Sequence, residues 1–206
     1  MATGVMRVIV AIVALALPLP GAAQLSPPES AEQPRIPSES SDFRVGPEVG
    51  GWALQVSGAF FLESWDLNAF RERLAGGSVS AFRQLTPRWA IGFETNLLHV
   101  WQDPLGDVML PALSVMARWT ALQHGKTAVF IEGGGGPSYA SGMVPNEGTR
   151  FNLVAHTGIG LSRSVTPRID LIGGARWLHV SNNGLDGRRR NPDIQALGLY
   201  VGWSVH

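Results

Sequence analysis

The sequence lacks cysteine, carries little charge and has no long apolar run, and each of these absences narrows the class of protein. With no cysteine the chain forms no disulfide, so its stability must come from burial and backbone pairing. Acidic and basic residues balance at 16 each, which argues against a nucleic-acid partner, because phosphates favour a basic excess. Beyond the N-terminus no uninterrupted apolar run approaches the roughly 18 residues expected of a membrane-spanning helix.

The N-terminus has the pattern of a secretory signal peptide. Arg7 supplies a positive charge, residues 8–17 form an apolar run, and Gly21-Ala22-Ala23 is a small-residue cleavage site. The apolar run is too short to span a bilayer, for which roughly twenty residues are needed. We therefore expect residues 1–23 to be removed. Gln24, which follows the cleavage site, offers no thiol for lipid attachment.

Two further regions follow the signal peptide. Residues 24–45 are rich in proline, serine and glutamate and poor in apolar side chains, which predicts a flexible periplasmic tail. Residues 46–206 are long enough for one domain with its own core, and all of the periodic patterning lies there.

Eight segments of roughly ten residues in this domain alternate between polar and apolar residues, as half-buried β-strands do. The segments lie at about 52–62, 74–84, 89–101, 108–119, 126–135, 151–163, 168–181 and 193–205. Closed barrels of the bacterial outer membrane have an even number of antiparallel strands. The predicted fold is therefore all-β, an eight-stranded antiparallel transmembrane β-barrel.

The connections between these segments alternate in length. Short turns are expected at 86–88, 123–126 and 166–168, and longer links at 64–73, 102–107, 138–150 and 182–193. Outer-membrane barrels have short periplasmic turns and longer extracellular loops. The four longer links are therefore expected to face the outside of the cell.

Side-chain parity predicts an apolar exterior around a polar lumen. In segment 168–181, Leu171 and Trp177 share one face, whereas Asp170 and Arg176 share the other. Other polar residues with lumen parity, together with Arg176, are expected to form hydrogen bonds and ion pairs and not a second active site. These residues are Glu94, Glu132 and His156.

The seven tryptophans are expected to form two interfacial girdles. Four lie near the predicted periplasmic ends and three toward the outward ends, as in membrane-embedded barrels. The two sets are Trp52, Trp89, Trp119 and Trp203, and Trp65, Trp101 and Trp177. The alternative is a soluble secreted β-barrel that binds a small apolar ligand, with the tryptophans in its core.

His179 and Ser181 form the one pairing with an obvious catalytic chemistry. Two residues apart on a strand, they share a face, and their parity matches Trp177, so they are expected to point outward toward lipid. A histidine can take the proton of a serine hydroxyl as it attacks an ester carbonyl. Interfacial hydrogen bonding without catalysis is the alternative interpretation of the same two residues.

The stretch from Arg176 to Gly184, followed by Asn191-Pro192 and a closing strand, resembles the lipid A 3-O-deacylase family of outer-membrane barrels. The resemblance implies hydrolysis of the acyl ester at position 3 of lipid A by a Ser-His-acid site on the outer wall. It implies Ser181 as the nucleophile and His179 as the base. Asn182, through its backbone or side chain, is then the oxyanion donor, and Asn191 has a supporting role.

The acid position departs from this resemblance. Four residues after Asn191, where the family's motif has glutamate, the chain has Gln195, which cannot offset an imidazolium charge. In serine proteases a neutral amide in place of the orienting acid lowers turnover by about ten-thousandfold. Three alternatives stay open: Asp193 replaces the acid, Gln195 suffices for weak activity, or the site is silent.

The sequence thus predicts an outer-membrane lipid A deacylase that needs neither metal nor organic cofactor. A catalytically weak or silent structural barrel is the alternative function, because of Gln195. Lipid A within lipopolysaccharide is the expected partner, bound by a monomer or a homodimer. Arg188, Arg189 and Arg190 are candidate ligands of its phosphates, which guanidinium groups bind well.

Overall fold

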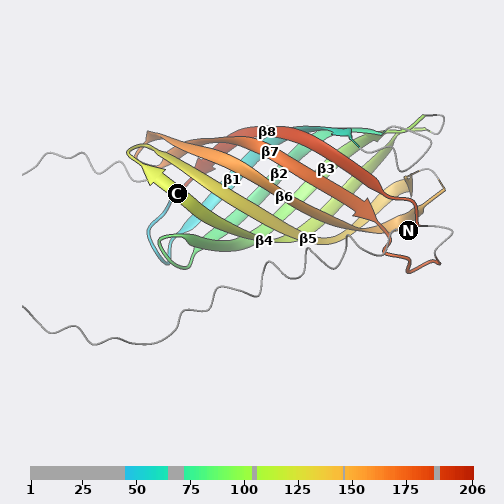
Figure 1. The fold of residues 1–206 in the computed structure, drawn as a ribbon, viewed down its shortest axis with the longest axis horizontal. Helices are drawn as coiled ribbons and strands as arrows, with labels where there is room; N and C mark the ends of the chain where they lie inside the picture. The colour runs from blue at the N-terminus through green and yellow to red at the C-terminus, as the bar shows by residue number, and fades with distance from the viewer. Residues whose placement is uncertain (1–44, 65–71, 104–105, 146, 188–190) are drawn as a thin grey trace, which may run out of the picture. The chain divides into compact units, whose positions relative to one another are not determined.

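The computed structural model describes residues 45–64, 72–103, 106–145, 147–187 and 191–206, which form a closed antiparallel β-barrel. Figure 1 shows the tilted strands closing on one another. The expected signal peptide and nearly all of the expected tail lie outside the described residues. The strands are β1 (Trp52–Glu63), β2 (Arg73–Gln84), β3 (Trp89–Trp101), β4 (Val108–His124), β5 (Thr127–Val144), β6 (Thr149–Thr166), β7 (Ile169–Ser181) and β8 (Ile194–Val205).

Each strand pairs with its neighbours in sequence, and β1 closes the barrel against β8. The closure runs from Leu54 opposite Val205 to Glu63 opposite Ala196. Closure leaves no free sheet edge, which is what a lipid environment requires. The predicted eight-stranded barrel is therefore confirmed. Within the described segments no helix has the length and apolarity needed to cross a bilayer.

The central strands are longer than the sequence pattern predicts. β5 continues to Val144, so most of the link expected at 138–150 is strand, and only residues 145–148 connect β5 to β6. The alternation fails here because Gly134 and Gly136 occupy inward positions without side chains. An added Cβ at either would overlap a backbone carbonyl oxygen of β4. The strand continues where the polarity pattern stops.

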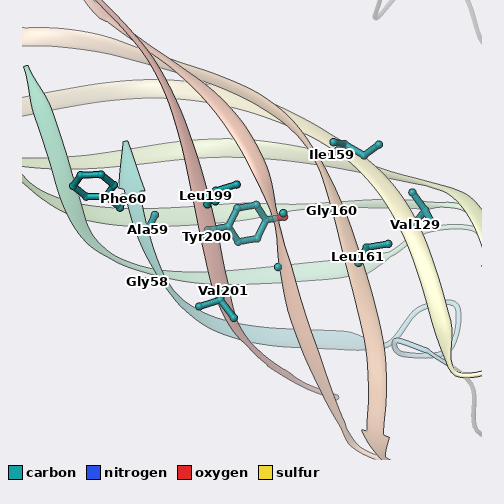
Figure 2. A pocket seen from close by; sticks show the side chains of 12 residues that line it. Gly58, Ala59, Phe60, Val129, Ile159, Gly160, Leu161, Leu199, Tyr200 and Val201 are labelled. Atoms are coloured by element: carbon teal, nitrogen blue, oxygen red, sulfur yellow. The ribbon is translucent and has the colours of Figure 1, made fainter. Parts of the chain in front are cut away.

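The outer wall is a continuous apolar surface. One cross-strand row runs over five strands through Val129, Leu161, Gly173, Val201 and Gly58. All five residues line an apolar depression, and Figure 2 labels Gly58, Val129, Leu161 and Val201 among its lining residues. Such a surface is stable in lipid and unstable in water, as the predicted apolar exterior requires.

A buried ion-pair network crosses the middle of the lumen. Arg176 donates to Glu94 at 2.7 Å and to Glu132 at 2.6 Å, and Arg118 donates to Glu132 at 2.7 Å. His156 lies 3.7 Å from Glu94. The expectation of lumen ion pairs is confirmed for Glu94, Glu132 and Arg176, which together with Arg118 tie four strands together.

The lumen is polar only in part, which corrects the expectation of a polar interior throughout. One end of the barrel carries the β1–β2, β3–β4, β5–β6 and β7–β8 connections and is here called the long-loop end. There the lumen is filled by an apolar cluster contributed by all eight strands. The cluster contains Phe61, Leu74, Leu98, Val100, Val108, Leu110, Ala112, Ala140, Val144, Val154, Leu178, Val180, Ile194 and Ala196. Parity alone could not show this difference, because it distinguishes the two faces but not the two ends.

Tryptophans lie at both rims of the barrel. The opposite end, with the β2–β3, β4–β5 and β6–β7 turns, is here called the short-turn end. Trp52 and Trp89 begin their strands there, and Trp89 pairs with Trp119. Trp203 lies at the same end, and Trp101 closes β3 at the other. Amphipathic rings at these depths match the interfacial girdles of membrane barrels. Trp65 lies outside the described residues.

Candidate active site

His179 and Ser181 lie at the end of β7 nearest the long loops. The alternating residues Leu178 and Val180 are buried in the apolar cluster, so His179 and Ser181 project from the opposite, outer face of the strand. Ser181 is nonetheless only 6% exposed. The outward orientation predicted from parity is what the structure has.

The two side chains are in direct contact. The Nε2 atom of His179 lies 2.9 Å from the Oγ atom of Ser181, which is a hydrogen-bonding distance. The ring of His179 stacks on Trp177, with centroids 5.7 Å apart and planes inclined by 15°. The stacking supports the plane of the imidazole in which Nε2 contacts the serine hydroxyl, the arrangement that proton transfer from hydroxyl to ring would require.

Asp193, the residue before β8, and Gln195, within β8, both lie beside His179. In the β7–β8 register Gln195 stands directly opposite His179. The Nε2 atom of Gln195 donates to the Oδ2 atom of Asp193 at 2.7 Å. The same Oδ2 atom lies 3.6 Å from Nδ1 of His179, the ring nitrogen that faces away from the serine. Nδ1 is buried and has no hydrogen-bond partner among the described residues.

The side chain of Asn182 is engaged in the loop. Its Nδ2 donates to Thr149 at 3.1 Å, and its Oδ1 accepts from the Gly184 amide at 2.9 Å. This local bond and the left-handed backbone of Asn183 and Gly184 form a turn directly after β7. The side-chain amide of Asn182 is therefore a weaker candidate for the oxyanion donor than its backbone N–H, which follows Ser181 directly.

The remaining predicted residues are only partly in view. Asn191 lies in the segment that leads into β8, and its Oδ1 is buried with no hydrogen-bond partner in the described part of the chain. Arg188, Arg189 and Arg190 lie outside the described residues. Sequence reasoning missed Thr149, which holds the loop after β7, because no motif links it to the site.

The fold and this constellation define a class of protein: a bacterial outer-membrane β-barrel with a hydrogen-bonded histidine and serine on its outer wall. The sequence profile of the family described as lipid A 3-O-deacylase (PagL) matches residues 75–204. The chain therefore belongs to the lipid A 3-O-deacylase family.

Two solved structures of outer-membrane proteins are similar to this chain. Neisserial surface protein A (NspA) is 16% identical, with a TM-score of 0.59 over 75% of this chain and 96% of that one. The outer membrane protein OprG from Pseudomonas aeruginosa is 10% identical, with a TM-score of 0.46 over 76% and 95% of the two chains. Comparison with curated proteins finds no match. At these identities the likeness to NspA concerns the fold alone.

Family and fold together locate the protein in the bacterial outer membrane. This location sets aside the soluble ligand-binding barrel considered above. The family's activity is hydrolytic and its substrate is lipid A.

Proposed function

We propose that this protein removes an ester-linked acyl chain from position 3 of lipid A, with Ser181 as nucleophile and His179 as general base. The observation that carries the proposal is the 2.9 Å contact between Nε2 of His179 and Oγ of Ser181 on the outer wall. A family that acts on lipid A needs its reactive group at the level where lipid A headgroups meet acyl chains. We propose that the long-loop end of β7 lies at this level, which is supported by the outward orientation of the longer loops in such barrels.

In the first half-reaction the Ser181 hydroxyl attacks the ester carbonyl carbon while Nε2 of His179 accepts its proton. The backbone N–H of Asn182 is the proposed donor to the oxyanion of the tetrahedral intermediate. The intermediate collapses by breaking the bond between the carbonyl carbon and the sugar oxygen. That oxygen takes the proton from His179, and the acyl group remains on Ser181.

In the second half-reaction water attacks the acyl-serine. His179 accepts a proton from the water and returns it to Oγ of Ser181 as the carbon–oxygen bond to serine breaks. The products are a free fatty acid and a lipid A that has lost one chain. Arg188, Arg189 and Arg190 are proposed to bind the lipid A phosphates, so they act on affinity and not on the chemical steps.

The proposal predicts the effect of truncating either member of the pair. Ser181→Ala and His179→Ala should each lower the release of fatty acid from lipid A in detergent micelles by at least about a thousandfold, because the nucleophile or its base is lost. Both variants should migrate as folded barrels on unheated gels. Folded variants that retain wild-type release would contradict the proposal.

A second candidate function is a structural barrel that keeps the fold without the activity. The observation that favours it is Gln195, a neutral side chain where the family's motif has glutamate. In that case wild-type protein and Ser181→Ala protein would release fatty acid at the same background rate.

A further inference from the structure

We infer that the missing glutamate of this site is replaced by two residues, Asp193 as the carboxylate that serves His179 and Gln195 as the donor that holds it. The inference rests on the proposed function and deepens it. It concerns positioning residues, because both act on the substrate only through the imidazole.

The register decides what Gln195 can do. It stands opposite His179 on the outer face, where a carboxylate would reach the imidazole directly. An amide can accept a hydrogen bond there but carries no charge to offset the imidazolium. Its NH₂ group, in contrast, is a donor that glutamate lacks, and it donates to Oδ2 of Asp193 at 2.7 Å. Glutamine at position 195 thus lacks the charge of glutamate, but it provides a donor that holds the carboxylate of Asp193 beside it.

Asp193 is placed to supply that charge. Its Oδ2 lies 3.6 Å from Nδ1 of His179, slightly longer than a hydrogen bond, and both side chains are about one-quarter exposed. Nδ1 is buried with no hydrogen-bond partner among the described residues, so a carboxylate is what this atom lacks. Catalytic hydrogen bonds are often long in substrate-free enzymes and shorten when substrate binds.

Gln195 lies within the strand ladder of β8, whereas Asp193 lies just before it. The backbone carbonyl oxygen of Gln195 accepts a hydrogen bond from the backbone N–H of Ser64, the residue after β1, at 2.9 Å. Asp193 precedes the first residue of β8 and follows Pro192, outside the ladder. In the inferred substrate complex the carboxylate of Asp193 contacts Nδ1 while Gln195 keeps its bond to that carboxylate. When Nε2 accepts the serine proton, the carboxylate then stabilises the imidazolium.

Exchanging the two side chains tests the inference. Asp193→Asn should lower kcat by up to about ten-thousandfold, the loss seen when the orienting acid of a serine protease becomes an amide. The double variant D193N/Q195E places the carboxylate opposite His179 and an amide beside it, and should recover most of that loss. Gln195→Glu alone should give no gain, since two carboxylates would then face each other. A merely structural role of Asp193 would not produce rescue by the exchange.

Asp107→Asn is the matched control. Asp107 also pairs with a histidine at the long-loop end, with Oδ2 lying 3.0 Å from His99, but it is remote from Ser181 in the sheet. This variant should keep wild-type kcat.

Wild-type kcat in folded Asp193→Asn protein, or a tenfold gain from Gln195→Glu alone, would overturn the inference and leave the proposed function intact. If Asp193→Asn does not fold, the double variant and Gln195→Glu decide the question by the same comparison. An inactive wild-type chain, or an active Ser181→Ala variant, would instead overturn the proposed function.

Discussion

At the scale of single residues, Arg176 has the largest predicted effect on stability. It is buried in the lumen between Glu94 and Glu132 and bonds to both. Removing one partner from a buried ion network leaves charge without compensation, which costs more than the network itself contributes. The same logic explains why these charged residues face inward and not toward lipid.

Arg176→Met should therefore destabilise the barrel by about 3 kcal/mol or more, because Glu94 loses its arginine partner while Glu132 keeps Arg118. The measurement is the urea midpoint of unfolding in detergent. Arg168→Met, at an exposed turn, is the matched control and should behave as wild type. Equal midpoints for both variants would contradict the assigned role of the network.

At the residue scale, the sequence was enough to predict the histidine–serine pair but not the contacts of the residues around it. His179 and Ser181 could be found because spacing of two on a strand fixes a shared face. The choice between Asp193 and Gln195 depended on the β7–β8 register, which alternation does not specify. Asn182 was expected to serve the site through either of two groups, and the bond of its side chain to Thr149 depends on a loop conformation that no local pattern encodes.

At the scale of elements, β5 shows how glycine shapes the barrel. Gly133 faces outward and Gly136 inward, although both lie in one run of four glycines. A Cβ added at Gly136 would overlap the carbonyl oxygen of Leu113 on β4, whereas at Gly133 the nearest atom lies 3.4 Å away. Close strand approach thus requires glycine at Gly134, Gly135 and Gly136, where an added Cβ would overlap a backbone carbonyl oxygen, but not at Gly133.

Gly136→Ala should lower the fraction of protein that folds into the barrel and should destabilise the folded form by about 1–3 kcal/mol, the usual cost of overpacking. Gly133→Ala is its control and should fold normally. Gel mobility of unheated samples and the urea midpoint measure both effects. Identical behaviour of the two variants would refute the assignment of close approach to Gly136.

The end of the β1–β2 connection carries a pH-dependent element. Glu72, directly before β2, is buried beside Glu63, and burial together with that neighbour raises the pKa of Glu72 to about 8. Since the folded state binds this proton more tightly than the unfolded chain, the group's contribution to stability is complete at acidic pH. It is lost as the pH rises from about 4 toward 8.

Glu72→Gln should therefore lessen the fall in stability between about pH 5 and about pH 9, because the amide has no proton to lose. Urea midpoints at the two pH values provide the comparison, with the exposed Glu48→Gln as control. The prediction fails if the wild type and Glu72→Gln lose equal stability over that range.

The elements themselves were predicted where alternation was regular. All eight strands were located, and the bounds of β1, β2, β3, β7 and β8 agree with the expected ranges to within one residue at each end. The ends of β4, β5 and β6 were not predicted correctly, because glycine, proline and polar outward residues interrupt the pattern while backbone pairing continues. Hydrogen bonding between strands, which the sequence does not display, decides where such strands end.

At the scale of the whole molecule, the residues that stabilise the barrel lie in its lumen, and the candidate site lies on its outer wall. In the described barrel an apolar cluster fills one end of the lumen and an ion network crosses its middle, whereas the candidate site lies on the outer wall. The apolar outer surface fits the outer membrane, the layer that holds the lipid A on which the family acts. Under the proposed function, a site on that surface would receive lipid A by lateral diffusion and would need no enclosed pocket.

The central claim is that Ser181 and His179 deacylate lipid A from the outer wall of this barrel. Mass spectrometry of lipid A from cells that produce the protein tests it most directly. We predict that wild-type protein converts lipid A to a form lighter by one acyl chain, while folded Ser181→Ala protein leaves its mass unchanged. Unchanged lipid A in cells with folded wild-type protein, or the same mass loss with Ser181→Ala, would contradict the account.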